Sequence, residues 1–323
     1  MKSYNNEYGT IYLGDNREVL SIFEDDSIEA MITDPPYGYR MHGASWDYDI
    51  PTIDFWKQTL RVLKPGAHIL VASGTRVQHR MACNIEDAGF VIRDVIAWVY
   101  AEGVSKGADL GKSTDGKWKG WKITVKPAME FWTLARKPLG ENTIAKNLKK
   151  YQTGALHIDA CRVDNEFLKP WKKNRKPISY SVAYGEFRSG TVPFTSRSHP
   201  EGREPYNFIH DGSDEVTRLF TNGAQHFFYC PKASQKERRE GLEGKNIHPT
   251  VKPVELMRYL VRLITPPNGT VLDPFLGSGS TAVACIKENV KYIGIEREEN
   301  YFNIACQRVN YSLEQLLIPL EEK

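Results

Sequence analysis

Short apolar runs alternate with helix-like segments along the N-terminal part of the chain. Four runs have the length and composition of buried strands. They are Thr10–Gly14, Ile28–Thr33, His68–Ser73 and Val91–Val99. Between them, segments with apolar residues at helical spacing predict helices. These segments are Asn16–Phe23, Ile53–Leu63 and Arg76–Ala88. The alternation predicts a mostly parallel sheet with helices on both faces.

The C-terminal part of the chain has the pattern of a second half of this sheet. Thr270–Asp273 resembles a buried strand, and the glycine-containing run Pro274–Thr281 follows it. Further on, the pattern predicts the helix Ala282–Glu288, the strand Tyr292–Ile295 and the helical run Asn300–Leu317. Only 27 residues follow Glu296. The remaining strands of the sheet therefore have to come from the N-terminal half.

The glycine-containing run has the chemistry of a nucleotide site. Gly277 and Gly279 let the backbone approach a ligand closely. Ser280 and Thr281 stand where a helix N-terminus offers free N–H groups to an anion or carboxylate. This loop suits a nicotinamide or flavin enzyme as readily as one that uses S-adenosylmethionine, because all of these cofactors place an adenosine across strand ends.

Two acidic residues follow predicted strands and are candidates for the same adenosine. Glu296 ends the strand after the glycine loop, where an acid is well placed to bind ribose hydroxyls. Asp15 directly follows the first predicted strand. A structural role as the N-cap of a helix suits Asp15 equally well.

Asp34-Pro35-Pro36-Tyr37 directly follows the apolar run Ile28–Thr33. The prolines fix the backbone and lack N–H groups, so we expect the carbonyls of Asp34 and Pro35 to point outward. These acceptors could hold an exocyclic NH2 group while Tyr37 covers the ring, as enzymes that extrude a nucleobase require. Adenine N6 and cytosine N4 both fit. The alternative is a simple strand-ending turn, in which all of these residue types are common.

The order of these motifs resembles that of the amino-group DNA methyltransferases of the permuted beta class, which carry the catalytic motif early and the cofactor motif late. Asp34–Tyr37 resembles the catalytic motif, Asp273–Thr281 the cofactor loop and Glu296 the ribose-binding acid. His248–Pro253, followed by the helical run Val254–Ile264, resembles the segment that embraces the cofactor. A further stretch, Lys126–Pro138, resembles the phage and prophage subgroup.

The resemblance implies a doubly wound, mostly parallel, Rossmann-like α/β sheet that is circularly permuted and carries an inserted target-recognition lobe. It implies transfer of the methyl group of S-adenosylmethionine to the exocyclic amino group of a flipped base in double-stranded DNA. Asp at the first motif position favours adenine N6 in this family, where Ser is commoner for cytosine N4. By this resemblance the catalytic residues are Asp34, Pro35, Pro36 and Tyr37. The cofactor-binding residues are Asp15, His248, Thr250, Lys252, Asp273, Phe275, Gly277, Ser278, Gly279, Ser280, Thr281 and Glu296.

Several alternatives remain open at this stage. A cytosine N4 enzyme, an RNA methyltransferase with a similar site, a nicotinamide oxidoreductase and a non-catalytic DNA-binding module are the competing functions. The sequence also leaves open whether the protein forms a homodimer and whether a cognate restriction endonuclease accompanies it.

Positive charge gathers in the middle of the chain. The whole chain has a net charge of only +3, but residues 141–240 hold 17 Lys and Arg against 12 Asp and Glu. This stretch interrupts the strand and helix pattern and includes the basic residues Lys172, Lys173, Arg175 and Lys176. It predicts a lobe that contacts a polyanion, although a charge run is often only a solvated face. We therefore divide the chain into a catalytic part (1–140), a target-recognition insertion (141–245) and a cofactor-binding part (246–323).

A second candidate for contact with DNA is the loop Ser105–Lys126, which has six Lys, four Gly and two Trp. It shows little apolar periodicity, and we expect it to be mobile. Basic loops beside a catalytic strand can close over the DNA backbone and stabilise a flipped base. The residues that we single out are Lys117, Trp118 and Lys119.

Cysteine and histidine patterns argue against rival chemistries. The five cysteines are widely spaced and contain no CxxC pair, so we expect neither disulfides nor a metal site. No cysteine stands beside Asp34, which disfavours methylation at a cytosine carbon because that reaction needs a thiol nucleophile. His248 is the only histidine in a recognisable motif, and a packing role suits it as well as a functional one. The chain has no apolar segment typical of a signal peptide or a membrane span, which predicts a cytoplasmic protein.

Overall fold

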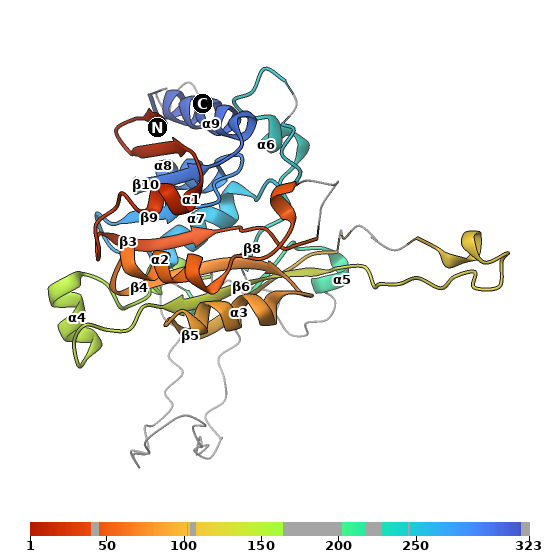
Figure 1. The fold of residues 1–323 in the computed structure, drawn as a ribbon, viewed down its shortest axis with the longest axis horizontal. Coiled ribbons are helices and arrows are strands. Elements are labelled where there is room, and N and C mark those ends of the chain that lie inside the picture. The colour runs from red at the N-terminus through yellow and green to blue at the C-terminus, as the bar shows by residue number, and fades with distance from the viewer. Residues whose placement is uncertain are drawn as a thin grey trace, which may run out of the picture.

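A mixed sheet of ten strands forms the centre of the computed structural model, which describes residues 1–39, 45–101, 103, 108–163, 202–217, 228–244 and 246–317 (Figure 1). The strands follow the order β1-β2-β10-β9-β3-β4-β6-β5-β7-β8 across the sheet. Their bounds are β1 Lys2–Asn5, β2 Gly9–Leu13, β3 Ile28–Thr33, β4 Leu63–Gly74, β5 Val91–Val99, β6 Met129–Arg136, β7 Phe208–His210, β8 Phe228–Tyr229, β9 Thr270–Asp273 and β10 Lys291–Glu296.

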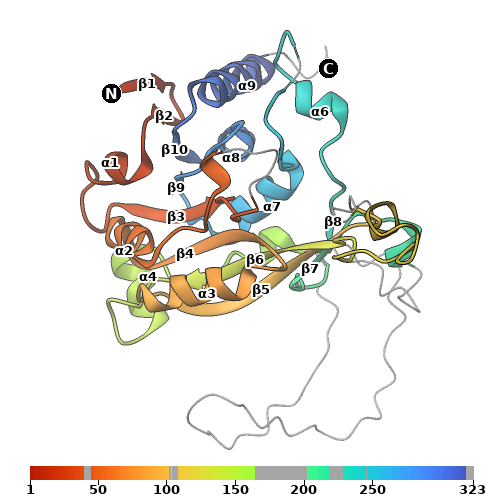
Figure 2. The ribbon, with the colours of Figure 1, turned by 45° about the vertical axis from the view of Figure 1, so that its right-hand side comes forward.

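Helices cover both faces of this sheet (Figures 1 and 2). Their bounds are α1 Asn16–Leu20, α2 Ile53–Val62, α3 Gln78–Asp87, α4 Ile144–Tyr151, α5 Asp214–Thr217, α6 Gln235–Arg239, α7 Val254–Ile264, α8 Ser280–Lys287 and α9 Glu299–Leu317. Because side chains alternate along a strand, Ile32 joins the buried cluster under α7, α8 and α9, whereas Met31 joins the cluster under α1, α2 and α3. The two separate clusters confirm the doubly wound α/β fold.

The two predicted motifs end neighbouring strands. β3 pairs in parallel with β9, with Ala30 opposite Val271 and Met31 opposite Leu272. β9 in turn pairs in parallel with β10. Carboxyl ends of adjacent parallel strands meet at one edge of a sheet, which is where ligands bind in such folds. The turn after β3 and the glycine loop after β9 therefore lie side by side, although they are far apart along the chain.

Strands β1 and β6 were not predicted and run against their neighbours. β6 pairs antiparallel with both β4 and β5, and β1 pairs antiparallel with β2. The pairing of β2, β10, β9, β3 and β4 is parallel throughout, so the sheet is mostly parallel as predicted. Strand β6 brings Glu130 to the edge of the sheet at which the two motifs lie.

The range that we predicted as a target-recognition insertion, 141–245, is described in part. Its helix α4 packs against β4, and its strands β7 and β8 extend the main sheet beyond β5. The basic residues Lys172, Lys173, Arg175 and Lys176 lie outside the described residues. In the described part of the chain no helix has the length and apolar character needed to cross a bilayer.

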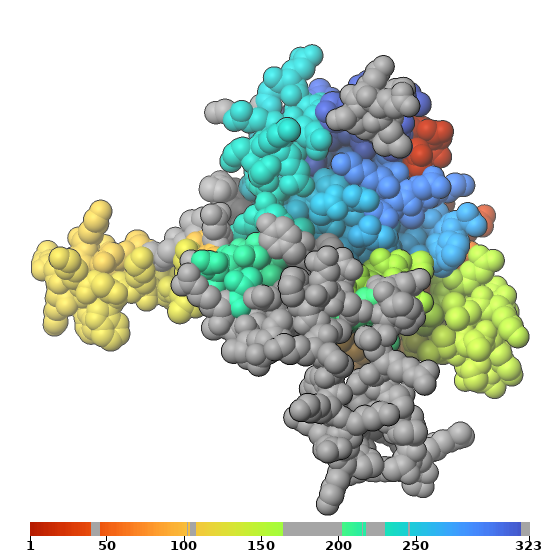
Figure 3. Space-filling model, turned by 180° about the vertical axis from the view of Figure 1, so that it is seen from behind, coloured from red at the N-terminus to blue at the C-terminus, as the bar shows by residue number. Residues whose placement is uncertain are grey.

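The arm, which we define as residues 108–126, projects from the body of the protein (Figure 3). It contains the short 3₁₀ helix η3, Leu110–Ser113. The Asp109 carboxylate stabilises the tip of the arm by accepting hydrogen bonds from the backbone N–H groups of Gly111 at 2.8 Å and Gly120 at 3.0 Å. Lys117, Trp118 and Lys119 lie on this tip, away from the cleft described below.

Candidate active site

A cleft of about 1190 Å³ opens at the carboxyl ends of β3, β9 and β10. Nearly all of the predicted catalytic and cofactor residues line it. These are Asp15, Asp34, Pro35, Pro36, Tyr37, His248, Thr250, Lys252, Asp273, Phe275, Gly277, Ser278, Ser280, Thr281 and Glu296. Gly279 is the exception, because it lies behind the loop, where a Cβ atom would approach Ala305 to 3.0 Å.

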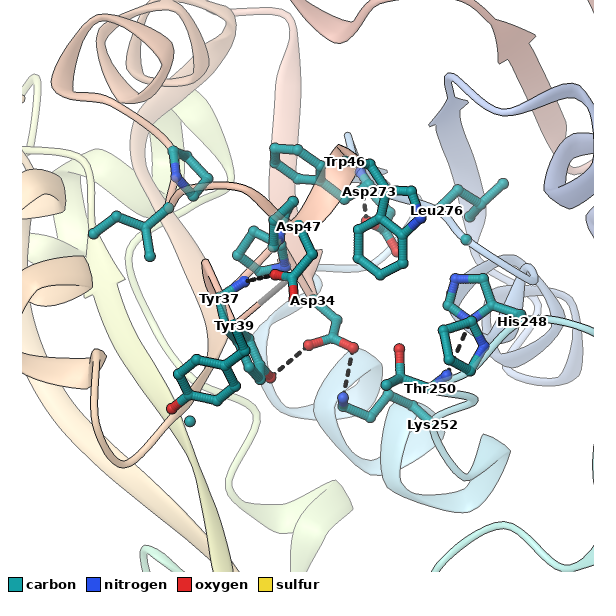
Figure 4. A pocket seen from close by; sticks show the side chains of 18 of the residues that line it. Asp34, Tyr37, Tyr39, Trp46, Asp47, His248, Thr250, Lys252, Asp273 and Leu276 are labelled. Atoms are coloured by element: carbon teal, nitrogen blue, oxygen red, sulfur yellow. Dashed lines mark hydrogen bonds and ion pairs between the residues drawn. The ribbon is translucent and has the colours of Figure 1, made fainter. Parts of the chain in front are cut away.

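Asp34 stands in the cleft between a tyrosine and a lysine (Figure 4). The Tyr37 hydroxyl donates to Asp34 Oδ1 at 2.6 Å, and Lys252 Nζ donates to Asp34 Oδ2 at 2.5 Å. Burial and the nearby Asp34 carboxylate raise the pKa of Tyr37 well above its usual value, so the phenol keeps the proton that it donates. Asp34 is thereby fixed in position with its charge compensated.

The turn after Asp34 is held by a residue that the sequence analysis missed. Asp47, on the short 3₁₀ helix η2 (Ser45–Asp47), is buried and accepts hydrogen bonds from the backbone N–H groups of Tyr37 and Gly38, both at 2.9 Å. Among the described residues, no protein donor bonds to the carbonyl of Pro35. The turn is therefore rigid and keeps an acceptor beside the Asp34 carboxylate, as its two prolines predicted.

Asp273 ends the neighbouring strand in a different environment. Its Oδ1 atom accepts hydrogen bonds from the Thr33 hydroxyl at 2.7 Å and the Phe275 N–H at 3.1 Å, and its Oδ2 atom accepts one from the Thr281 hydroxyl. A carboxylate has about four acceptor positions, so roughly one remains for a ligand. Burial raises the pKa of Asp273 to about 6 even though these hydrogen bonds oppose the shift.

Glu296 is held by the backbone around the glycine loop. Its Oε2 atom accepts a hydrogen bond from Gly277 N–H at 2.8 Å, and its Oε1 atom accepts one from Glu298 N–H at 2.7 Å. Burial raises the pKa of Glu296 to about 7. The carboxylate is therefore oriented on the cleft wall, where it can accept hydrogen bonds from vicinal hydroxyls.

The glycine loop packs against the segment that precedes α7. Gly277 has a φ of +57°, and a Cβ atom there would come within 2.8 Å of His248 Nε2. The His248 ring also packs edge-on against Tyr301, with ring centroids 4.5 Å apart. Burial lowers the pKa of His248 to about 4, so the imidazole is neutral near pH 7. The packing of the loop against His248 thus gives this histidine a structural role and explains why residue 277 is a glycine.

Arg308 on α9 fixes the other side of the glycine loop. It is buried, and its Nη1 atom donates to the Ser278 carbonyl oxygen at 2.7 Å and to the Ser280 hydroxyl at 3.2 Å. The Ser280 hydroxyl in turn donates to the Lys252 carbonyl oxygen at 2.9 Å. Arg308 was not predicted from the sequence, because an arginine within an amphipathic helix is usually a surface residue.

Asp15 has the structural role, the N-cap of a helix, that the sequence offered as the alternative to adenosine binding. It is the N-cap of α1, where its Oδ1 atom accepts from Arg17 N–H at 2.9 Å, and its carboxylate also pairs with the Arg17 guanidinium at 3.1 Å. Asp15 nevertheless lines the cleft. A role in adenosine binding stays a prediction.

The residues around the glycine loop fit an adenosine cofactor with a charged amino-acid tail. Glu296 offers an oriented carboxylate, and Phe275 offers an aromatic surface that packs on Phe55 with ring centroids 5.1 Å apart. Ser280 begins α8, and the first N–H groups of a helix have no acceptor within the helix. The hydroxyl groups, the adenine ring and the carboxylate of such a cofactor could therefore each contact a matching protein group along this part of the cleft.

Comparisons with known proteins show which family the chain resembles. The profile of a family described as DNA methylase, the N6 and N4 methyltransferases, matches residues 28–307. The Type II methyltransferase M.HindIII of Haemophilus influenzae is 25% identical over 284 residues, which cover 84% of this chain and 72% of that protein. M2.LlaDCHI of Lactococcus lactis is 29% identical over 179 residues, which cover 55% of this chain and 62% of that protein.

Solved structures of other proteins share the fold. The PvuII DNA methyltransferase, described as cytosine-N4-specific, has a TM-score of 0.52 at 18% identity and covers 94% of this chain and 87% of its own. The complex of M1.HpyAVI with SAM has a TM-score of 0.50 at 22% identity and covers 93% of this chain and 98% of its own. Since the family profile spans most of the sequence, from β3 into α9, the chain belongs to the DNA methylase family of N6 and N4 amino-methyltransferases.

Proposed function

We propose that this protein transfers the methyl group of S-adenosylmethionine to the exocyclic amino group of a base in double-stranded DNA, and that adenine N6 is the target. The observation that carries the proposal is the pairing of β3 with β9. This pairing places the acceptor-rich turn at Asp34 and the glycine loop at Gly277 in one cleft. Among the known subgroups, the order of the motifs favours the permuted beta class, and Lys126–Pro138 favours its phage and prophage branch.

The cofactor part of the cleft lies around the glycine loop. When bound, S-adenosylmethionine supplies a methyl group on a sulfonium centre. Glu296 binds the ribose hydroxyls, Phe275 packs near the adenine, and the remaining acceptor position of Asp273 takes an amino group. The loop from Gly277 to Thr281 holds the methionyl part.

The base-binding part of the cleft lies around Asp34. An exocyclic amino nitrogen is a poor nucleophile because its lone pair is delocalised into the ring. When the Asp34 carboxylate and the Pro35 carbonyl accept its hydrogens, the nitrogen favours a pyramidal geometry with its lone pair directed at the methyl group. It also stabilises the positive charge that develops on nitrogen. Holding both reactants in place can contribute about 7–11 kcal/mol in the best model systems.

Tyr37 offsets part of the cost of base extrusion. Stacking of a base on an aromatic side chain is worth about 1–3 kcal/mol, which is comparable to the cost of unstacking. Tyr39 packs edge-on against Tyr37, with ring centroids 5.7 Å apart, and also lines the cleft.

The choice of adenine rests on Asp34, because Asp at the first motif position favours adenine N6 in the family. Expression of the protein in a host that lacks DNA methylation, followed by modification-sensitive sequencing, tests the base, the position and the target sequence together. N6-methyladenine at a defined sequence supports the proposal. N4-methylcytosine would overturn the choice of base, and unmodified DNA together with methylated RNA would overturn the choice of substrate.

Equilibrium titrations provide a separate test of the cofactor. We expect S-adenosylmethionine to bind the purified protein and NAD to leave it unchanged. The reverse result would favour the nicotinamide oxidoreductase.

A further inference from the structure

Lys252 lies between two carboxylates that come from different parts of the fold. Its Nζ atom is 2.5 Å from Asp34 Oδ2, in the turn after β3, and 3.3 Å from Glu130 Oε2, on β6. The lysine is 7% exposed, and all three side chains line the cleft. Burial alone would lower the pKa of Lys252, but the two carboxylates raise it above its usual value, so the ammonium is charged.

The ammonium of Lys252 occupies the place that the proposed reaction requires for the amino group of the base. It donates a hydrogen bond to Asp34, and it lies 5.9 Å from the centroid of the Tyr37 ring. The substrate amino group has to donate to the same carboxylate, next to the same ring. Asp34 keeps free acceptor positions, but a base amino group that approaches Oδ2 beside the Tyr37 ring meets the ammonium there and competes with it for this oxygen.

Glu130 offers the displaced ammonium a second partner. Its Oε2 atom is buried, and the 3.3 Å contact with Lys252 lacks hydrogen-bond geometry. Glu130 is fixed on a strand between β4 and β5, opposite Gly74 and Trp98. Lys252, by contrast, has a flexible four-carbon stem. A small rotation of that stem would therefore complete the contact with Glu130.

We propose that Lys252 moves from Asp34 to Glu130 when the target base enters the cleft, which makes Glu130 a positioning residue for methyl transfer. The inference rests on the proposed function. In the free protein the ammonium compensates the charge of Asp34 and keeps its carboxylate in place. Without Glu130, release of Asp34 would leave a buried cation with no carboxylate partner among the residues that the structure describes, which is strongly unfavourable. Glu130 therefore lets a neutral amino group displace a charged one.

Extrusion of the target base provides the test. The target sequence comes from the sequencing experiment above, and a duplex with 2-aminopurine at the target position reports extrusion by its fluorescence. The duplex is titrated in the presence of a non-transferring amine analogue of S-adenosylmethionine. We expect Glu130→Gln to lower the extruded fraction and to reduce kcat/KM by about tenfold to a hundredfold, a range typical of coupled buried groups. In the Lys252→Met background, Glu130→Gln should have no further effect on extrusion, because no ammonium remains to be moved.

Matched variants separate this role from a purely structural one. Glu29→Gln is the control, because Glu29 is also a partly buried carboxylate paired with a lysine, Lys64, at 2.5 Å, but it lies outside the cleft. Glu130→Asp keeps the charge and should restore part of the extrusion. It also replaces Glu130→Gln if the latter does not fold, as judged by thermal unfolding and S-adenosylmethionine binding.

Two results would overturn the proposal. In one, Glu130→Gln leaves the extruded fraction at the wild-type value. In the other, it lowers the fraction equally with and without Lys252. Failure of the wild-type protein to methylate any DNA would instead overturn the proposed function, so the two failures are distinguishable.

Discussion

The cleft and the arm differ in how far their side chains are hydrogen-bonded or buried by the protein itself. In the cleft, Asp34, Asp273 and Glu296 each accept at least two hydrogen bonds from the protein. In the arm, Trp121 and Ile123 are 63% and 77% exposed, respectively. Five lysines and two aspartates also give the arm an excess of positive charge. The carboxylates of the cleft are hydrogen-bonded before any ligand binds, whereas the arm exposes apolar and basic side chains.

From this contrast we propose two different tasks. Catalysis depends on groups whose positions are fixed in advance, and a buried, hydrogen-bonded cleft provides them. Affinity for a polyanion depends on exposed positive charge and decreases with salt. Exposed apolar and basic side chains on one projecting arm fit that second task. Substitutions in the cleft should therefore change the rate, whereas substitutions in the arm should change binding.

Asp34→Ala should have the largest effect. It removes the carboxylate that we propose as the acceptor for the amino hydrogens, and loss of one preorganised group of this kind costs about a hundredfold to a thousandfold in kcat. Single-turnover methyl transfer measures the loss, and titration with S-adenosylmethionine should show nearly unchanged binding. The change also leaves Lys252 with Glu130 as its remaining carboxylate partner, so thermal unfolding has to confirm that the variant is folded. A folded variant that retains most of the wild-type rate would contradict the role of Asp34.

Tyr37→Ala should reduce transfer less than Asp34→Ala does. The loss of stacking is worth about 1–3 kcal/mol, which corresponds to about a 5-fold to 150-fold lower kcat/KM. Tyr37→Phe is the matched control, because it keeps the ring and removes only the hydroxyl that donates to Asp34. Losses as large for Tyr37→Ala as for Asp34→Ala, in folded proteins, would show that the ring is obligatory and would reverse this ranking.

The sequence predicted the cleft far better than it predicted what holds the cleft together. The bounds of β3, β5, β9 and α7 agree with the predicted segments. Alternating apolar positions and turn residues determine such elements locally. The adjacency of the two motifs also followed, because connection rules leave few arrangements for an alternating α/β chain.

The supporting residues depend on contacts that no local pattern encodes. Asp47 resembles any turn residue until its bonds to the backbone at Tyr37 and Gly38 are seen. Glu130 lies on β6, whose place between β4 and β5 is set by nonlocal pairing. Lys252 was predicted to bind the cofactor on the basis of its motif, but its side chain contacts Asp34 and Glu130.

Glu296 gives the cleft a dependence on pH. Because burial raises its pKa to about 7, and hydroxyl donors favour the charged form, S-adenosylmethionine should bind about tenfold more weakly at pH 6 than at pH 8.

Stability of the free protein should change in the opposite direction. A carboxyl group whose pKa is raised on folding stabilises the fold at low pH and loses that contribution as pH rises toward about 7. Isothermal titration and thermal unfolding across this range measure both trends, and Glu296→Gln should flatten them. Binding that is independent of pH in the unmodified protein would contradict the role of Glu296.

Lys117→Ala with Lys119→Ala should have the smallest effect on the reaction, because these lysines lie on the arm and outside the cleft. Each phosphate contact contributes about 0.9 to the slope of log K against log salt, so the double variant should lower that slope by about 1.8 and weaken DNA binding by less than about tenfold at moderate salt. The matched control is Lys287→Ala with Lys291→Ala, which removes the same charge from exposed positions at the end of α8 and the start of β10. Fluorescence anisotropy at several salt concentrations measures both slopes. Equal slopes for the two double variants would assign the effect to net charge, whereas a change confined to Lys117 and Lys119 would place the arm on the DNA backbone. An unchanged kcat at saturating DNA would then complete the separation between an arm that binds and a cleft that catalyses.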